Sequence, residues 1–212
     1  MNDTLTLTVS ALALLLLAGW LVRQGEAVPA QGDEATQQTG TWDDLIVAMS
    51  PGTYATAGGD GTDQQRNLDA FLDMIAFCEG TAGPDGYRTM FGGRLFDSYA
   101  DHPRVRFSYT NLAGVSLVTT AAGRYQFIAR TWDGVRAKLG LQDFSPANQD
   151  AGAVELIRER GALNDVKAGR FESAVAKCRP VWASLPGAGA NQPERSMTAA
   201  ANAYAQAGGN FA

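Results

Sequence analysis

Glu79 is the first residue whose type and position could do chemistry. It ends the apolar stretch FLDMIAFCEG, at the point where the chain enters a loop rich in glycine. A carboxyl group flanked by Phe77 and a buried helix, with no charged partner, has a raised pKa, which is what a general acid needs. A glutamate at a helix end can equally point into water. The pattern therefore makes Glu79 a candidate acid and leaves both interpretations open.

Other catalytic arrangements are less well supported by the sequence. A glycosidase with two carboxylates needs a second acid about 5 to 9.5 Å from the first, and the spacing of Asp85, Asp97 and Asp101 does not rank them. Cys78 could act as a nucleophile with His102 as its base, although a small buried residue is the commoner role of such a cysteine. Two cysteines and one histidine cannot form a four-cysteine or multi-histidine metal site, so no metal or cofactor is expected.

A second candidate pattern is GRYQF, residues 123–127. We expect it to leave a strand and open a helix, which would place Tyr125 and Gln126 at the rim of a cleft. Aromatic faces hold sugar rings, and amides hold hydroxyl and N-acetyl groups, so this pairing suits a glycan. Trp182, just before the glycine-rich turn of WASLPGAG, offers a second aromatic wall. Packing in the core is the alternative role for Tyr125 and for Trp182.

The chain divides into three parts, of which the first is predicted to enter a membrane. Residues 5–22 are uncharged and mostly apolar, and a helix of this length measures about 27 Å, just enough to cross a bilayer. A signal peptide cleaved near residues 28–30 is the alternative, but no Lys or Arg precedes the apolar run and the run is long. We therefore expect residues 1–23 to form a transmembrane or signal-anchor segment. Its orientation is only weakly set by Arg23.

The second part, residues 24–67, is expected to be a flexible, acidic, glycine-rich linker. It has few large apolar residues, so it cannot bury enough surface to offset the entropy of ordering. The exception is WDDLIVAM, residues 42–49, which could form one or two helical turns that dock on another surface. Residues 1–67 hold eight acidic and two basic residues, whereas the rest holds 14 and 15. The net charge of −5 therefore arises in the N-terminal third, and it argues against a general nucleic-acid binder.

The third part, residues 68–212, is expected to be the globular domain that positions the candidate site. The chain has 212 residues, of which 45% are hydrophobic and 18% are charged, and this allows a packed core of good size. Apolar residues at helical spacing predict an amphipathic helix over residues 68–79. A strand is predicted over residues 115–119, and further helices over residues 125–139, 146–160, 163–168, 170–178 and 192–206.

Several long motifs together resemble one family, the lambda-type phage endolysins. They run in the family's order from about residue 68 to 192 and comprise FLDMIAFCEGT, LFDSYADHP, GRYQF, WDGVRAKLGLQDFSPANQDAGA, ERGAL and WASLPGAGANQ. The resemblance implies a lysozyme-like α+β fold, mostly helical, with two lobes and a small β region flanking a substrate groove. It also implies cleavage of peptidoglycan between N-acetylmuramic acid and N-acetylglucosamine, by a lytic transglycosylase that leaves 1,6-anhydro ends.

The resemblance also assigns roles to individual residues. Glu79 would be the catalytic acid and base, because the family's catalytic glutamate falls in the matched segment CEGT. Tyr125, Gln126 and Trp182 would hold the sugars. Arg124 would steady the catalytic glutamate or a carboxylate of the wall peptide. No cofactor is implied, and the catalytic domain is expected to be monomeric.

Two features depart from the family pattern. Cys78 precedes the catalytic glutamate where a serine is familiar, and the loop over residues 82–90 is shorter than expected. The family groove brings the segments of Cys78 and Cys178 toward each other, so an oxidising compartment could join them in a disulfide. Two free buried thiols are the alternative.

The expected setting is the bacterial inner membrane or the periplasm, with residues 5–22 as the tether and peptidoglycan as the partner. A hydrolytic lysozyme of the same fold and a non-catalytic glycan-binding virion protein are the alternatives. The sequence leaves open whether the enzyme acts in lysis or from the virion during entry. It also leaves open whether the N-terminus is cleaved or released.

Overall fold

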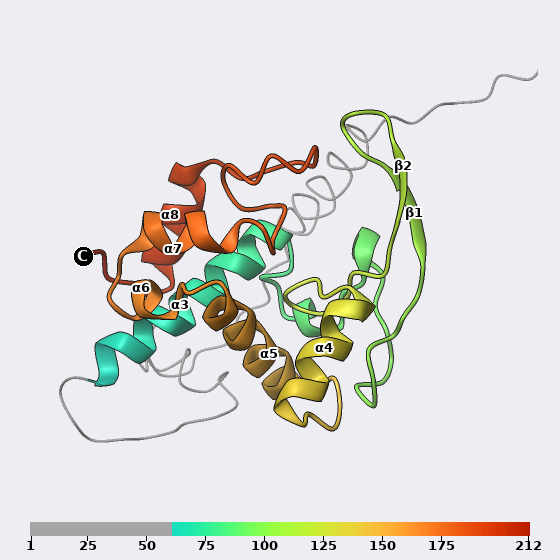
Figure 1. Cartoon of the computed structure of the whole chain (residues 1–212), viewed down its shortest axis with the longest axis horizontal. Helices are drawn as coiled ribbons and strands as arrows, with labels where there is room; N and C mark the ends of the chain where they lie inside the picture. The colour runs from blue at the N-terminus through green and yellow to red at the C-terminus, as the bar shows by residue number, and fades with distance from the viewer. Residues whose placement is uncertain (1–60) are drawn as a thin grey trace, which may run out of the picture.

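The computed structural model describes residues 61–212, which are mostly helical with one small sheet of two strands (Figure 1). The predicted membrane segment, residues 1–23, and the predicted helical turns of residues 42–49 lie outside the described residues. Within residues 61–212, every helix is too short or too polar to span a bilayer.

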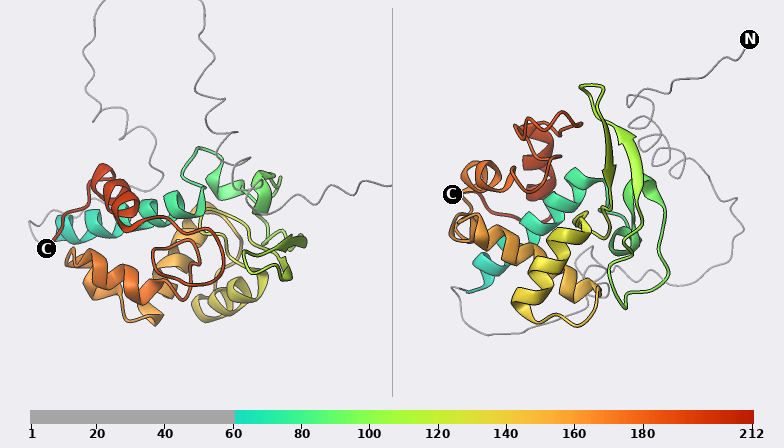
Figure 2. Two further views of the ribbon diagram at one scale, coloured as in Figure 1. Left: turned by 90° about the horizontal axis from the view of Figure 1, so that it is seen from above. Right: turned by 45° about the vertical axis from the view of Figure 1, so that its right-hand side comes forward.

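The helices form two packed groups around a central helix, α3. Helices α6 and α8 pack against α3, and α7 packs on α6. Helices α4 and α5 form a second pair, which reaches α3 through α5 (Figures 1 and 2). The bounds are α3 Gly61–Glu79, α4 Ala129–Leu139, α5 Pro146–Glu159, α6 Leu163–Lys167, α7 Phe171–Cys178 and α8 Met197–Gln206.

The β region is a hairpin at the edge of the molecule (Figure 2). Its strands pair antiparallel, so that Phe107 lies opposite Thr119 and Ser108 opposite Val118. The strand predicted over residues 115–119 is confirmed to within one residue. Two short 3-10 helices connect α3 to the hairpin. The bounds are η1 Gly86–Arg88, η2 Phe91–Gly93, β1 Phe107–Thr110 and β2 Ser116–Thr119.

The globular part begins earlier than the sequence predicts. The linker is predicted to run to residue 67, but α3 already begins at Gly61. Asn67 on this helix is buried. Its Nδ2 donates to the carbonyl of Lys167 at 3.1 Å, and its Oδ1 accepts the N–H of Asn210 at 2.8 Å. The predicted boundary is therefore wrong, because this turn is tied to the C-terminal part of the chain.

Two helices begin later than their patterns predict. Helix α4 starts at Ala129 rather than at residue 125, because residues 123–127 form a turn in which Gln126 has a φ of 47°. Helix α8 starts at Met197, where the hydroxyl of Ser196 accepts the N–H of Ala199 at 3.1 Å and caps the helix.

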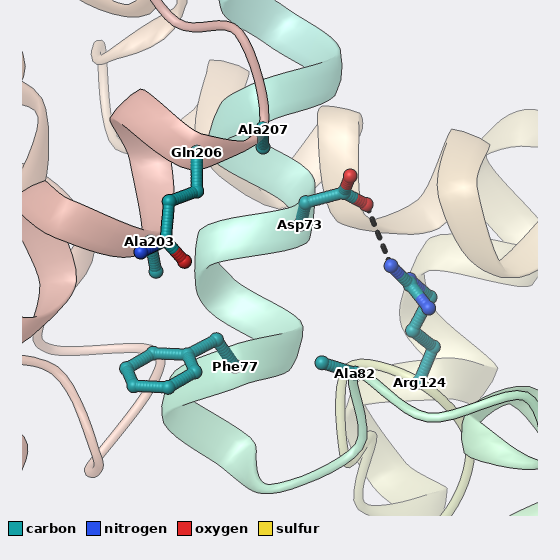
Figure 3. Close-up of a pocket in the computed structure, with 7 residues that line it drawn as sticks. All are labelled: Asp73, Phe77, Ala82, Arg124, Ala203, Gln206 and Ala207. Atoms are coloured by element: carbon teal, nitrogen blue, oxygen red, sulfur yellow. Dashed lines mark hydrogen bonds and ion pairs between the residues drawn. The ribbon is translucent and has the colours of Figure 1, made fainter. Parts of the chain in front are cut away.

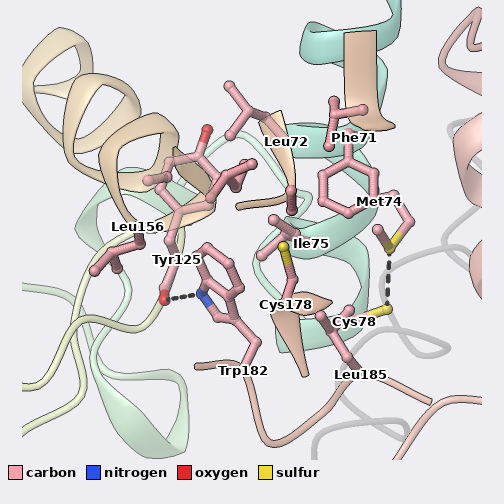
Figure 4. Packing of buried hydrophobic residues seen from close by; sticks show 14 of the residues in the cluster. Phe71, Leu72, Met74, Ile75, Cys78, Tyr125, Leu156, Cys178, Trp182 and Leu185 are labelled. Carbon is pink, nitrogen blue, oxygen red and sulfur yellow. Dashed lines mark hydrogen bonds between the residues drawn. The ribbon is translucent and has the colours of Figure 1, made fainter. Parts of the chain in front are cut away.

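Both cysteines are free and buried, so of the two possibilities that the sequence left open the structure has the free thiols and not the disulfide. Cys78 Sγ lies 3.7 Å from Met74 Sδ, one turn earlier on α3, so its thiol packs along its own helix (Figure 4). Burial raises the pKa of both thiols to about 12. Neither thiol is ionised near neutral pH, so Cys78 does not suit a nucleophile.

Candidate active site

Glu79 lies at the C-terminal end of α3, where the chain turns sharply. Gly80 adopts a φ of 75°, a left-handed conformation that glycine adopts without strain. Its N–H donates to the carbonyl of Phe77 at 3.1 Å, and the N–H of Thr81 donates to that of Ala76 at 2.8 Å. These bonds end the helix and fix the direction of the Glu79 side chain.

The Glu79 carboxyl group is held by one side chain from a distant part of the chain. The hydroxyl of Ser184 donates to Glu79 Oε1 at 2.6 Å. Burial raises the pKa of Glu79 to about 7, and the hydrogen bond from Ser184 offsets part of that rise. Near neutral pH the group is therefore present in both forms, as a residue that gives and then takes a proton requires.

Ser184 belongs to a loop, residues 183–195, that is folded by its own hydrogen bonds. The N–H of Arg195 donates to the carbonyl of Ser184 at 2.9 Å. The carboxylate of Glu194 accepts the N–H groups of Gly187 at 2.8 Å and Gly189 at 2.5 Å. These hydrogen bonds shape the loop that carries the Ser184 hydroxyl.

The same loop contacts the β hairpin. The N–H of Leu112 donates to the carbonyl of Asn191 at 2.8 Å, and Gln192 Nε2 donates to the hydroxyl of Tyr109 at 3.1 Å. The 183–195 loop therefore connects two segments far apart in the sequence: it contacts the end of α3 through Ser184 and the hairpin through residues 191 and 192.

Half-buried aromatic side chains line the hairpin face that carries Tyr109. The ring centroid of Phe91 lies 5.2 Å from that of Tyr109 and 6.1 Å from that of Phe107. Sequence reasoning missed these rings because it predicted a strand only over residues 115–119. The alternation of Phe107 and Tyr109 around a serine is the signal that could have found them.

Tyr125 and Trp182 are core residues, which corrects the prediction that they form an aromatic wall. Their exposed fractions are 2% and 3%, so neither ring has a face that a sugar can reach. Trp182 Nε1 donates to the carbonyl of Tyr125 at 3.1 Å (Figure 4). The Tyr125 hydroxyl donates to Asp150 at 2.7 Å.

Arg124 lies on the other side of α3 from the carboxyl group. Its Nη2 lies 2.6 Å from Asp73 Oδ1, and its guanidinium lies 5.1 Å from the ring centroid of Tyr87. Asp73 and Phe77 lie about one turn apart, on the same face of α3. Because Phe77 is two residues from Glu79, about 200° around the helix, this face is directed away from Glu79. Within the described residues no hydrogen bond or ion pair joins Arg124 to Glu79, so the structure does not support the predicted steadying of the glutamate. The alternative, a role toward a carboxylate of the wall peptide, stays a prediction. A cavity of about 250 Å³ lies on this side (Figure 3), lined by Asp73, Phe77, Ala82, Arg124, Ala203, Gln206 and Ala207.

Gln126 and His102 are engaged by the backbone. Gln126 Nε2 donates to the carbonyls of Thr89 and Gly123, both at 3.0 Å, and this holds the turn before α4. His102 is buried, with Nε2 2.8 Å from the carbonyl of Phe127. Gln126 could offer a sugar only its Oε1, so a role in substrate binding stays a prediction.

Comparison with known proteins identifies the family. A family model described as Endolysin matches residues 69–211. The chain belongs to the endolysin family. Among its relatives, the endolysin of Escherichia phage P2 is 44% identical over 158 residues, which cover 68% of this chain and 94% of the relative. The endolysin of Escherichia phage lambda is 44% identical over 146 residues, covering 66% and 90%.

Solved structures of lambda lysozyme have the same fold as this endolysin. One, complexed with a chitohexasaccharide, has a TM-score of 0.63 and 42% identity, and covers 69% of this chain and 97% of its own. A second has a TM-score of 0.59 and 40% identity, with the same coverage. The predicted lysozyme-like α+β fold is therefore confirmed. So is the coarse activity, because endolysins of this lysozyme family degrade peptidoglycan.

Replacing Ser184 by alanine should move the pH dependence of this endolysin. The hydroxyl lowers the pKa of Glu79, so its loss should raise that pKa further. If Glu79 must start protonated, the fall in activity at high pH should move to higher pH. Initial rates of wall clearing between pH 5 and 9 would measure this. If the alkaline limb of the pH profile were unchanged in Ser184→Ala, the Ser184 hydroxyl would not set the pKa of Glu79. Ser173→Ala, on α7, is the control and should leave the profile unchanged.

Proposed function

We propose that this endolysin acts as a lytic transglycosylase, with Glu79 as its one catalytic carboxyl group. Glu79 protonates the glycosidic oxygen as the bond to C1 of N-acetylmuramic acid breaks. The resulting carboxylate then takes the proton of the C6 hydroxyl of the same sugar while that oxygen bonds to C1. The products are a free N-acetylglucosamine 4-hydroxyl and a 1,6-anhydro-muramic end, and no water is consumed.

A single carboxyl group held at a pKa of about 7 carries this proposal. Such a group can donate and accept a proton in turn near neutral pH. The substrate supplies its own nucleophile, and proximity makes a water activated by a second carboxylate unnecessary. The lambda lysozyme that is complexed with a chitohexasaccharide supports a glycan as the substrate.

Two of the three aspartates that could serve as a second carboxylate are in surroundings that do not favour that role. Asp97 is fully exposed. Asp101 is held in ion pairs by Arg104 at 3.2 Å and Arg136 at 3.0 Å. These surroundings support a reaction with one catalytic carboxyl group.

We expect three variants to lose much less activity than the roughly hundredfold that follows the loss of a catalytic acid or base: Asp85→Asn, Asp97→Asn and Asp101→Asn. Clearing of purified cell wall would give the rates, and thermal unfolding would show that each variant is folded. The ends released by the wild type should resist reduction by borohydride. Reducible muramic ends, with one of these aspartates essential, would instead identify a hydrolytic lysozyme.

We further propose that residues 5–22 tether the enzyme to the inner membrane. The support is their apolar composition and their length. Deleting residues 1–23 should leave a soluble, active enzyme, because the endolysin family model matches residues 69–211 and residues 1–23 lie outside it. Fractionation of expressing cells would test the tether. Full-length protein in the soluble fraction would contradict it.

A further inference from the structure

Exposed large apolar side chains are concentrated in one region of the described structure. Seven of the nine lie between residues 95 and 128, in the hairpin and the segments beside it: Leu95, Val105, Leu112, Val115, Leu117, Val118 and Ile128. Exposed apolar side chains that are grouped in this way mark an interaction site more often than scattered ones do.

The hairpin has two distinct faces. Side chains alternate along each strand, so Phe107, Tyr109 and Leu117 share the face that contacts Phe91. Ser108 and its partner Val118 share the opposite face. We call this second face the outer face of the hairpin.

The outer face continues onto the start of α4. Thr120 lies two residues after Val118, and its hydroxyl accepts the N–H of Ala129 at 2.9 Å. This bond brings the start of α4, where Ile128 and Arg130 flank Ala129, to the end of the strand that carries Val118. The same alternation carried back from Ser108 brings Arg106 to this face.

The outer face combines exposed aliphatic and basic side chains. Val118 is 51% exposed and Ile128 is 45% exposed. The tip of the hairpin adds Leu112 at 57% and Val115 at 50%. The outer face and this tip have no aromatic ring, although rings are what sugars stack on, so this surface does not suit a glycan.

The two arginines of the outer face are free to meet an anionic partner. Arg106 and Arg130 are exposed and form no ion pair within residues 61–212. The nearby carboxylate of Asp133 is already neutralised by Arg104 at 2.7 Å. Arg130 lies in the first turn of α4, where the helix dipole disfavours a positive charge. The charge of Arg130 therefore does not stabilise the helix.

We propose that the outer face of the hairpin and its tip rest on an anionic lipid bilayer. Aliphatic side chains with arginines among them match the interfacial layer, where apolar groups enter and cations meet acidic headgroups. The surface would orient the catalytic domain beside the membrane. This inference does not depend on the transglycosylase reaction or on residues 5–22 spanning the bilayer.

A fluorophore at residue 118 of the full chain tests the proposal. Val118→Cys would carry a polarity-sensitive dye, and Cys78 and Cys178 stay unlabelled because they are buried. Glu172→Cys, exposed on α7, is the control position. Each labelled chain would be mixed with vesicles of phosphatidylglycerol or of phosphatidylcholine that carry a quencher in their acyl chains.

The dye at residue 118 should shift to the blue and be quenched in phosphatidylglycerol vesicles, whereas the dye at residue 172 should not. Arg106→Gln and Arg130→Gln should each weaken the quenching at residue 118 about fivefold. Arg160→Gln, which removes an exposed charge at the end of α5, should not. Equal quenching at both positions, or in both lipids, would overturn the proposal.

Two further outcomes would assign the surface to another occupant and would also overturn the proposal. A blue shift without lipid that grows with protein concentration would indicate a second copy of the chain. A blue shift without lipid that is independent of concentration, and is lost when residues 1–60 are deleted, would indicate the chain's own N-terminal part.

Discussion

Replacing Glu79 by glutamine should abolish turnover while leaving the enzyme folded. The amide keeps the shape of the side chain and can still pair with the Ser184 hydroxyl, but it has no proton to transfer to the glycosidic oxygen. A general acid or base contributes about 10²- to 10⁴-fold to a rate, and Glu79 would serve as both. Clearing of purified cell wall would measure the loss.

The same variant should change how stability depends on pH. Because the folded-state pKa of Glu79 is raised from 4.5 to about 7, the protonated form is favoured in the folded enzyme. That contribution is fully present below pH 4.5 and is lost as the pH rises through about 7, on the order of 1 to 3 kcal/mol. Glu79→Gln should lack this loss.

Two results would contradict the role of Glu79. One is a folded Glu79→Gln enzyme that clears walls within tenfold of the wild-type rate. The other is an equal loss of stability between pH 4 and 8 in both proteins. Glu172→Gln, on the exposed side of α7, is a matched control that should change neither property.

Replacing Trp182 by alanine should unfold much of the protein rather than weaken sugar binding. The side chain is 3% exposed and packs in the core with Tyr125, Ile75 and Cys178 (Figure 4). Deleting a buried tryptophan costs about 3 to 5 kcal/mol, a large share of the stability of a domain. Chemical denaturation would measure the free energy of unfolding.

Trp182→Phe is the control for that prediction. It keeps an apolar ring and loses only the hydrogen bond from Nε1 to the carbonyl of Tyr125, so it should cost much less. If Trp182→Ala were as stable as the wild type but bound glycan fragments more weakly, the tryptophan would be a sugar-binding residue after all.

The position of Glu79 could be predicted because the signal is local. An apolar helical stretch that ends in a glutamate and a glycine predicts the helix end and makes the glutamate a candidate acid, and the structure shows that its carboxyl group is buried rather than in water. Ser184 could not be predicted, because its partner lies 105 residues away and a serine within a glycine-rich turn has no pattern of its own.

Aromatic residues show where the sequence misleads. Tyr125 and Trp182 precede or follow glycine-rich turns, which is also how residues at a cleft rim occur. Their burial is decided by contacts between the 123–127 turn, α5 and the segment after α7, and no local pattern records these contacts. The positive φ of Gln126 likewise delays the start of α4 in a way that helical periodicity does not reveal.

The reaction type is tested most directly by digesting purified peptidoglycan in water labelled with heavy oxygen. A lytic transglycosylase closes the muramic ring with the sugar's own C6 oxygen, so the released muramic ends should carry no label by mass spectrometry. A hydrolase would place one labelled oxygen at C1 of each new muramic end. If the wild type produced labelled muramic ends, the transglycosylase account would be contradicted. If Glu79→Gln then produced no such ends, Glu79 would still be the catalytic acid.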